Sequence, residues 1–307
     1  MEIIVLSTAD VARLFNVTET TVKRWADEGA LCCQRTLGGH RKFLIKHVIE
    51  FAEKNNLEPL GVLKMPPGNQ CTSQLQLAIM ERDLPLLVDA FFERALSPER
   101  HNLAQFLSYL YEHKIPLWQI YDGIIKPAMQ RIGEAWQQGK IGIALEHQAT
   151  YATLDALSRL QARIHTKPSN GKTAILACLG EERHEIGLRC ASYLIESEGW
   201  QTLYLGANIP PDSVVLALRD VRPAMLCLSL TCSMNARALQ TRMTSMSKAA
   251  REVGACMLAG GLAMKQQDLA HGLFDHVVTT TKELLDLVSQ KESDLSARIP
   301  ALSVSSR

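Results

Sequence analysis

The pattern of apolar and polar residues divides the chain into three parts, and the first predicts a short helix, a tight break, a second helix, a hairpin and a third helix. The run "TADVARLF" places its apolar side chains on one face, with Thr8 positioned to cap the start. Thr18 caps "ETTVKRWADEG", in which Val22 and Trp25 face inward and Gly29 ends the helix. The run "LCCQRTLGGHRKFL" predicts a two-residue hairpin turn, and "HVIEFAEK" predicts the closing helix.

Beyond residues 55–72, which are rich in Pro and Gly and predict a linker, helical periodicity takes over. The amphipathic runs are "SQLQLAIMERDLPLLVDAFFERAL", "RHNLAQFLSYLYE", "PLWQIYDGIIKPAMQRIGEAWQQG" and "IGIALEHQATYATLDALSRLQARIH". Short connections between them predict a four-helix bundle over residues 73–168. Strand-like runs then alternate with helical ones: "TAILACL", "QTLYLG", "AMLCLSLT", "ACMLAGG" and "HVVTT". This order predicts a doubly wound, Rossmann-like parallel sheet over residues 169–291, which binds ligands at the carboxyl ends of its strands.

Composition narrows the class of protein. The 307 residues include 33 basic and 32 acidic side chains, so any affinity for nucleic acid must come from a local patch. The 8 cysteines form no CxxC pair and lie mostly in apolar runs, which favours buried thiols in a reducing compartment. The start of the chain lacks the pattern of a signal peptide, and no apolar run is long enough to span a bilayer. We therefore expect a soluble, cytoplasmic protein that binds no membrane, with residues 1–54 as its first domain and residues 292–307 as a disordered tail.

Candidate chemistry appears where the first strand-like run ends, in "CLGEERHEIGLR". In a doubly wound sheet this loop faces the ligand crevice, and it presents His184. Glu182 is placed to accept the N–H of one imidazole nitrogen, which strengthens the other nitrogen as a donor to a metal. Gly187 lets a bulky group approach the start of the next helix. Taken alone, a histidine in such a loop is more often a solvated surface residue.

Two further strand-like runs end at the same edge of the predicted sheet. Ser229 and Thr231 close "AMLCLSLT" with two hydroxyls on one face, and Gly260 and Gly261 end "ACMLAGG" without side chains. Each feature alone is also ordinary turn chemistry at the end of a strand. All four residues are predicted to lie at the edge of the sheet that also carries His184.

The combined pattern resembles the cobalamin-binding domain of methionine synthase, methylmalonyl-CoA mutase and related corrinoid proteins. It consists of Glu182-x-His184-x-x-Gly187, Ser229-x-Thr231 and Gly260-Gly261. Those enzymes generally carry Asp where this chain has Glu182. The resemblance implies that His184 ligates the cobalt from below. It also implies that the dimethylbenzimidazole of the cofactor enters a slot beside the sheet, lined by the two hydroxyl residues and the two glycines.

The helical region contains "EAWQQGKIGIALEHQAT", with Trp136 followed by Glu146 and His147. An indole and an adjacent acid–imidazole pair could cover the upper face of a planar cofactor and hydrogen-bond a ribose. The alternative is that Trp136 belongs to the core and that Glu146 and His147 form a solvated helix turn. The stretch resembles adenosylcobalamin-binding light sensors of the CarH/LitR type, which implies that these residues shield the adenosyl group. Some members carry histidine directly after the tryptophan, where this chain has Gln137.

The hairpin near the N-terminus is locally basic. It carries Arg35, His40, Arg41 and Lys42, with Lys46 and His47 beyond them, and no acidic residue lies between Glu28 and Glu50. A basic hairpin on a nearly neutral protein is an electrostatic footprint for phosphates. The helix before it carries polar residues opposite its apolar face, as a recognition helix in a major groove would. They are Thr20, Thr21, Lys23 and Arg24. An isolated pattern of this kind is often coincidental.

The whole N-terminal run resembles the MerR-type and excisionase-type winged helix, including the wing "RTLGGHR". The resemblance implies that the recognition helix reads base edges, while Arg35, His40 and Arg41 grip the backbone or minor groove of a double-stranded DNA operator. The expected fold class is therefore multidomain α and α/β. It comprises a MerR-type winged helix-turn-helix, a four-helix bundle that caps the cofactor, and a doubly wound cobalamin-binding domain.

The order of these parts resembles the layout of light-dependent repressors of the CarH/LitR type. The resemblance implies a regulator rather than an enzyme, with adenosylcobalamin as cofactor. In darkness a homo-oligomer, for example a tetramer, would hold the operator, and light-driven Co–C cleavage would release it. Two alternatives stay open at this stage. One is a DNA-binding sensor of cobalamin level without photochemistry, and the other is a corrinoid methyltransferase subunit.

Overall fold

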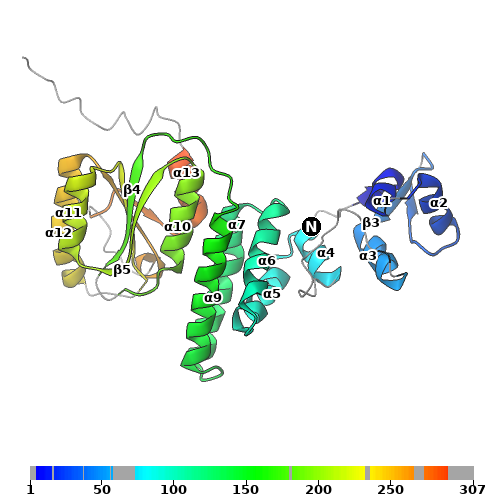
Figure 1. Ribbon diagram of the computed structural model, residues 1–307, viewed down its shortest axis with the longest axis horizontal. Helices are drawn as coiled ribbons and strands as arrows, with labels where there is room; N and C mark the ends of the chain where they lie inside the picture. The colour runs from blue at the N-terminus through cyan, green and yellow to red at the C-terminus, as the bar shows by residue number, and fades with distance from the viewer. Residues whose placement is uncertain are drawn as a thin grey trace, which may run out of the picture. The chain divides into compact units, whose positions relative to one another are not determined.

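The computed structural model describes residues 5–15, 17–36, 38–55, 57, 73–179, 182–231, 236–265 and 273–289 (Figure 1). The chain forms two compact units: Met1–Ile115 with Pro127–Ala149, and Pro116–Lys126 with Thr150–Arg307. Most of the predicted linker, 58–72, and the predicted tail, 292–307, lie outside the described residues. The domain boundaries expected from the sequence stay predictions. Among the described helices, none combines the length and the apolar character needed to cross a membrane.

The first unit begins with a small winged helix. Its elements are β1 (Val5–Ser7), α1 (Thr8–Phe15), α2 (Glu19–Asp27), β2 (Gln34–Arg35), β3 (Arg41–Leu44) and α3 (Ile45–Lys54). The strands pair antiparallel in the order β1-β3-β2. Strand β1 was not predicted, because three residues are too short to show a period. Its pairing sets Leu6 opposite Phe43, whose side chain is fully buried.

The core of the winged helix is built by the apolar faces that the sequence predicts. Val11 of α1 and Val22 of α2 are fully buried. Phe15, Trp25 and Phe51 pack as an aromatic cluster, with ring centroids 4.8 Å apart for Trp25 and Phe51 and 5.8 Å apart for Phe15 and Trp25. Full burial of one large apolar side chain stabilises a fold by about 1.5–3 kcal/mol. These contacts therefore hold the three helices together.

The helical region has more breaks than the sequence suggested. Its elements are α4 (Ser73–Glu81), α5 (Leu84–Leu96), α6 (Arg100–Glu112), α7 (Leu117–Ile120), the π-helix η1 (Tyr121–Ile125), α8 (Lys126–Gln137) and α9 (Ile143–Gln161). The first amphipathic run, predicted as one helix, is two helices. Arg82 has a left-handed backbone, with φ of 55°, and the Asp83 side chain caps α5 by accepting from the Leu86 N–H.

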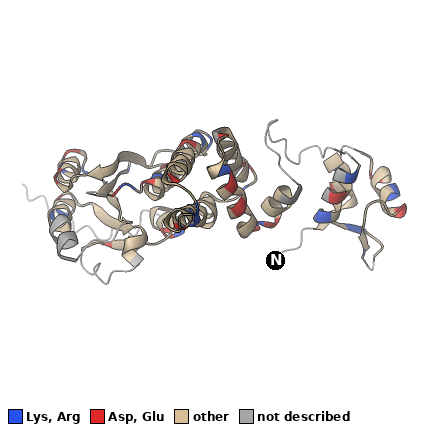
Figure 2. Ribbon diagram, turned by 90° about the horizontal axis from the view of Figure 1, so that it is seen from below, with Lys and Arg blue, Asp and Glu red and all other residues tan. Residues whose placement is uncertain are grey.

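The second unit contains a five-stranded parallel sheet. Its strands are β4 (Thr173–Leu179), β5 (Gln201–Ile209), β6 (Met225–Ser229), β7 (Cys256–Gly260) and β8 (His276–Val278), in the order β5-β4-β6-β7-β8. The strands carry no Lys, Arg, Asp or Glu (Figure 2), as expected for a sheet covered on both faces. The strand order reverses between β4 and β6, so this is the point where a doubly wound sheet binds its ligand.

Helices cover both faces of this sheet. They are α10 (Ile186–Ser197) and α13 (Thr281–Ser289) on one face, and α11 (Pro211–Val221) and α12 (Ala236–Val253) on the other (Figure 1). A short 3₁₀ helix, η2 (Leu262–Lys265), follows β7. The predicted doubly wound architecture is thus confirmed. Strand β5 is longer than the predicted run, and β6 ends at Ser229 rather than Thr231.

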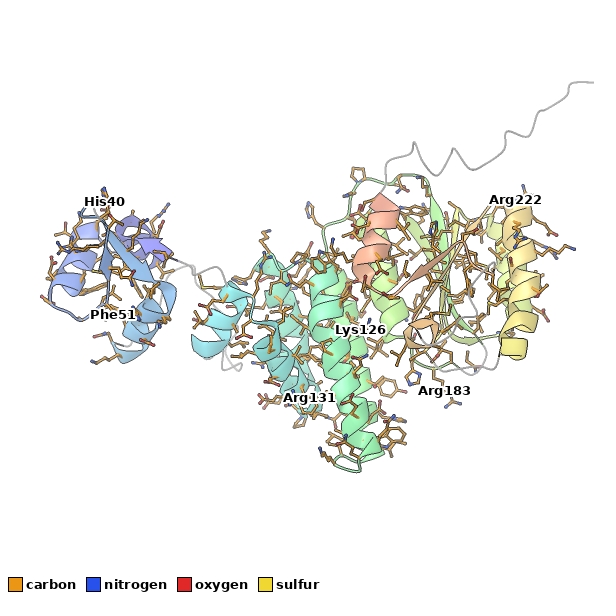
Figure 3. All side chains as sticks on the ribbon, turned by 180° about the vertical axis from the view of Figure 1, so that it is seen from behind. His40, Phe51, Lys126, Arg131, Arg183 and Arg222 are labelled. Carbon is orange, nitrogen blue, oxygen red and sulfur yellow. The ribbon has the colours of Figure 1, made fainter. Side chains whose placement is uncertain are left out.

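The segment Pro116–Lys126 is tied to the sheet unit by polar contacts. The Asp122 carboxylate accepts hydrogen bonds from the backbone N–H groups of Thr281 and Lys282, at 2.8 and 3.2 Å, and from the Thr281 hydroxyl at 2.8 Å. The Lys126 ammonium (Figure 3) donates to the carbonyl of Thr279 at 3.0 Å. Asp122 therefore caps the N-terminus of α13, where a negative charge is favourable.

Three cysteines of the sheet unit are buried as the sequence predicted, whereas Cys256 is only partly buried and Cys232 lies outside the described residues. Cys178, Cys190 and Cys227 are buried, and burial raises the pKa of each thiol, to about 12 for Cys178 and Cys227. Such thiols stay protonated and behave as small apolar side chains. Cys32 in the winged helix is exposed, so the expectation of burial does not hold there.

Candidate cofactor and nucleic-acid sites

The loop after β4 places Glu182 and His184 in direct contact at the switch point. Glu182 Oε1 accepts from the His184 ring Nδ1 at 2.7 Å and from the His184 backbone N–H at 2.9 Å. The Glu182 side chain is 4% exposed, whereas that of His184 is 67% exposed. A buried carboxylate beside Nδ1 favours the tautomer with the proton on that nitrogen, so the lone pair lies on Nε2. The hydrogen bond expected from the sequence is present.

Glu182 also joins the ends of neighbouring strands. Its Oε2 accepts from the Thr231 N–H beyond β6 at 2.6 Å, and its backbone carbonyl accepts from the Asn208 N–H of β5 at 3.0 Å. The sequence did not indicate Asn208, because a backbone donor leaves no trace in residue type. The carboxylate therefore orients the imidazole and closes the loops around it.

The residues expected to line the slot lie at the same edge of the sheet. Ser229 ends β6 and is nearly buried, and it pairs in register with Cys178 on one side and Gly260 on the other. Thr231 lies past the strand, so it does not share a strand face with Ser229 as predicted. The structure ties its N–H to Glu182.

Gly260 and Gly261 were inferred from the sequence to leave room for a ligand, but close contacts with the neighbouring backbone also favour glycine at both positions. Gly261 has φ of 107°, and a Cβ there would meet the Leu230 carbonyl oxygen at 2.3 Å. A Cβ at Gly260 would approach the Val278 carbonyl oxygen at 3.2 Å. Gly261 is thus required by the backbone of its own unit, whereas a Cβ on Gly187 would meet nothing within 4 Å. The open side of the loop also carries Arg183, which points outward (Figure 3).

A polar cluster beside His184 was not predicted. The Tyr204 hydroxyl donates to Glu185 Oε2 at 2.8 Å, and the Arg189 guanidinium lies 3.6 Å from the centroid of the Tyr204 ring. Burial, followed by the hydrogen bond to Glu185, raises the pKa of Tyr204. The spacing of Glu185 and Arg189 indicates an ion pair at the start of α10, but nothing in "QTLYLG" marks Tyr204 as a partner of Glu185. This cluster holds the residue directly after His184.

In the helical region, Trp136 and His147 are exposed, and Glu146 is partly exposed, with 24% of its side chain reaching solvent. Trp136 at the end of α8 is 43% exposed, which excludes the alternative that it belongs to the core. His147 Nδ1 lies 2.6 Å from Glu146 Oε2, and the His147 side chain is 62% exposed. Ile143 and Tyr151, which the sequence reading missed, are exposed on α9 at helical spacing from His147. An exposed indole and an acid–imidazole pair can contact a planar group and its hydroxyls.

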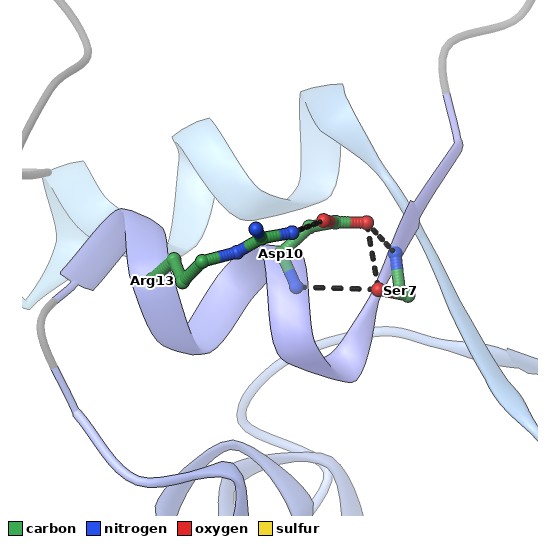
Figure 4. A network of polar contacts seen from close by, with 3 residues as sticks. All are labelled: Ser7, Asp10 and Arg13. Carbon is green, nitrogen blue, oxygen red and sulfur yellow. Dashed lines mark hydrogen bonds and ion pairs between the residues drawn. The ribbon is translucent and has the colours of Figure 1, made fainter.

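The caps of α1 and α2 set the geometry of the candidate DNA-binding helices. The Ser7 hydroxyl accepts from the Asp10 N–H, and Asp10 accepts from the hydroxyl and the N–H of Ser7 (Figure 4). These bonds, followed by that from Arg13, hold the pKa of Asp10 at about 2. The cap of α1 is therefore Ser7, not Thr8 as predicted. Thr18 caps α2 as predicted, by accepting from the Thr21 N–H.

On α2, Thr20, Lys23 and Arg24 are exposed, as the sequence predicted. Thr21 is only partly exposed, and its hydroxyl lies 3.0 Å from that of Thr18, so it belongs to the helix cap. Three of the four predicted residues thus remain on the open face of the helix.

The basic side chains of the hairpin are less open to solvent than predicted, because two of them contact a carboxylate of α2. Arg41 and Arg35 both contact Asp27 Oδ1, with Nη2 at 2.5 and 3.1 Å. The Arg41 side chain is only 16% exposed. His40 is exposed at the edge of the domain (Figure 3), and Lys42 is half-buried. The Thr36 N–H donates a hydrogen bond to the His40 carbonyl at 2.9 Å. Three residues separate this pair, so the loop is one residue longer than the predicted two-residue turn.

Comparison with known families matches three parts of this chain. Residues 5–56 match a helix-turn-helix domain, residues 172–288 match a B12 binding domain, and residues 87–161 match a second B12 binding domain. The chain therefore carries a helix-turn-helix domain and two B12 binding domains, in the order that the sequence predicted.

Two curated relatives and one solved structure are similar to the chain. It is 26% identical over 164 residues to the HTH-type transcriptional repressor CarH of Myxococcus xanthus, and 29% identical over 108 residues to the HTH-type transcriptional repressor CarA of the same organism. These matches cover 53% and 35% of this chain, and 54% and 35% of the relatives, so the chain spans about half the length of the first. The monomethylamine corrinoid protein of Methanosarcina barkeri shares the fold at 14% identity, with a TM-score of 0.53 over 67% of this chain and 98% of that one.

Proposed function

We propose that this chain, which joins a helix-turn-helix domain to two B12 binding domains, is a cobalamin-binding transcriptional repressor with adenosylcobalamin as its light-sensitive cofactor. The observation that carries the proposal is the hydrogen-bonded Glu182–His184 pair at the switch point of the sheet. An imidazole whose second nitrogen is held by a carboxylate is the usual form of a metal-binding histidine. The same chain carries a winged helix, and the two curated relatives are named as repressors.

On the lower side of the cofactor, we assign His184 as the cobalt ligand, through Nε2. Glu182 holds the ring, and the open space beside Gly187 leaves room for a large planar group. Ser229, Thr231, Gly260 and Gly261 are proposed to line the slot for the nucleotide tail.

On the upper side, we assign Trp136, Glu146 and His147 to the adenosyl group. The exposure of Trp136 and His147 suits residues that meet a ligand rather than the core, and the partly exposed Glu146 contacts the His147 ring. When bound, adenosylcobalamin would supply a Co–C bond that visible light can break. The role of the protein is to bind both faces of the cofactor and to respond to the presence or absence of the adenosyl group.

We propose that the state of the cofactor controls the oligomeric state of the protein, and through it the affinity for DNA. In darkness a homo-oligomer, for example a tetramer, would place several winged helices on one operator, and their linkage would raise the affinity without new contacts. After illumination the residues that held the adenosyl group would lose their ligand, and the equilibrium would shift away from the oligomer. The protein is thus a two-state switch and not an enzyme.

The test uses the full-length protein loaded with adenosylcobalamin in darkness. Its absorption spectrum, its elution from gel filtration and its binding to a duplex selected from a random-sequence pool are measured before and after illumination. We expect all three to change together. Methylcobalamin is the matched control, because it lacks the group that Trp136, Glu146 and His147 would hold, and it should not produce the larger species.

Two results would favour the alternatives. DNA binding that depends on cobalamin but not on light would indicate a sensor of cobalamin level. Failure of the loaded protein to enrich any duplex would point to a corrinoid methyltransferase subunit, a class to which the fold alone is equally suited. The winged helix is the observation that favours the repressor over that subunit.

A further inference from the structure

We infer that Asp27 is a positioning residue that fixes the basic hairpin against the recognition helix, and that Arg41 serves this tie rather than a DNA phosphate. The inference rests on the proposed DNA-binding function. It departs from the expectation that Arg35 and Arg41 both grip the backbone of the operator.

The tie has a simple geometry. Asp27 is the last residue of α2, and its Oδ1 accepts from Nη2 of Arg41 at 2.5 Å and from Nη2 of Arg35 at 3.1 Å. Arg35 and Arg41 face each other in the register of β2 and β3. One carboxylate oxygen therefore joins the end of the helix to both strands of the hairpin.

The two arginines differ in how much of each side chain reaches solvent. Arg41 is 16% exposed and its Nε is buried without a hydrogen-bond partner among the described residues, whereas Arg35 is 60% exposed. The hydrogen bond from Arg41 is the largest cause of the lowered pKa of Asp27, so the carboxylate is charged at neutral pH. The Arg41 side chain is thus largely covered at its contact with Asp27, whereas the Arg35 side chain is exposed enough to contact a phosphate.

A winged helix needs a fixed spacing between the helix in the groove and the wing on the backbone, because the two contacts must be made at once. The strands hold the base of the hairpin through Phe43 in the core, but the described residues beyond Arg35 and Arg41 are exposed. Asp27 supplies a polar contact between the end of the helix and the hairpin. Its charge also offsets part of the positive field, which lowers the affinity for DNA of any sequence.

The inference predicts opposite effects on specific and non-specific binding. Asp27→Asn removes a charge and loosens the wing, so affinity for random-sequence duplex should rise while the advantage of a selected duplex falls. Glu28→Gln is the matched control, since it removes the same charge from the next residue, whose carboxylate lies 4.0 Å from Arg24 and makes no ion pair with the described residues of the hairpin.

The experiment measures binding of the full-length protein to a duplex selected by the wild-type protein and to the random pool, over a range of salt. We expect the ratio of the two affinities to fall by about tenfold or more in Asp27→Asn and by less than about threefold in Glu28→Gln. Equal falls in the two variants would overturn the inference. Failure of the wild-type protein to enrich a duplex would instead count against the proposed function.

A second pair of variants separates the two arginines and covers the case in which Asp27→Asn fails to fold. Arg35→Gln should reduce the slope of log affinity against log salt by about one, as loss of a phosphate contact does, with little change in melting temperature. Arg41→Gln should lower the melting temperature and leave the salt slope unchanged. The reverse assignment, with the salt slope moved by Arg41→Gln, would show that Arg41 contacts DNA.

Discussion

Replacing Glu182 by Gln tests whether a buried carboxylate organises the cofactor loop. The carboxylate accepts from three donors: the His184 ring, the His184 backbone N–H and the Thr231 backbone N–H. An amide has one oxygen, so one side of the Gln side chain must present N–H groups to another N–H. The least costly orientation keeps the oxygen toward His184 and turns the nitrogen toward Thr231, whose N–H then loses its acceptor.

The size of the effect follows from these contacts. A buried backbone N–H without a partner costs about 1–3 kcal/mol, and because Thr231 is only partly buried the free energy of unfolding of the sheet unit should fall by about 1 kcal/mol, the lower end of that range. The bonds to His184 also change from charged to neutral, which weakens each by about 1 kcal/mol. Loss of such support for a metal-binding histidine weakens metal affinity by about 10–100-fold. We expect cobalamin affinity to fall within that range.

The assay combines denaturant unfolding of the cofactor-free protein with titration of adenosylcobalamin in darkness, followed by absorbance. Glu182→Asp is the matched control, because it keeps the charge and is the residue that corrinoid enzymes generally carry at this position. It should retain most of the affinity that Glu182→Gln loses. If Glu182→Gln matched the wild-type protein in both stability and affinity, the carboxylate would have no organising role.

Three further predictions concern single residues. His184→Ala should abolish the histidine-ligated cobalt spectrum while His147→Ala keeps it, and an unchanged spectrum in His184→Ala would remove His184 as the lower ligand. Because an amide is a poor cobalt ligand, the wild-type chain with Gln137 should give no bis-imidazole spectrum after photolysis; such a spectrum surviving desalting would contradict this. Asp10 has its pKa lowered from 3.8 to about 2, so its contribution to stability is present above pH 3.8 and is lost as the pH falls through 2. The destabilisation caused by Asp10→Asn should therefore vanish below about pH 2 in thermal unfolding, and a difference that persisted there would have another source.

The sequence predicts the helices and strands that extend over several periods and bury one face or both. The strand and helix order of the sheet unit, the caps at Thr18, and the hydrogen bond of Glu182 to His184 all follow from residue type and spacing. What it could not predict depends on neighbours that are distant in sequence or on backbone groups. Strand β1 exists only because β3 pairs with it, and Thr231 contributes an N–H rather than its hydroxyl. The tie at Asp27 could not be seen because its partners lie across a hairpin.

The break after Arg82 and the π-helix at Tyr121–Ile125 show a different limit. Both lie within runs whose apolar spacing continues without interruption, so periodicity alone joins them into single helices. The Asp83 cap and Pro85 are visible in the sequence and could have placed the first break. The roles proposed for Trp136, Glu146 and His147 stay predictions, because exposure alone does not name a ligand.

The cap that Asp122 forms on α13 makes the two compact units interlaced rather than consecutive. The backbone leaves one unit after Ile115, returns to it after Lys126 and leaves again after Ala149. A fragment that starts near residue 169 would keep the whole sheet, yet it would lack the carboxylate on which the N-terminus of α13 depends. The sheet unit is therefore not a removable module: residues that come before it in the sequence are part of its own fold.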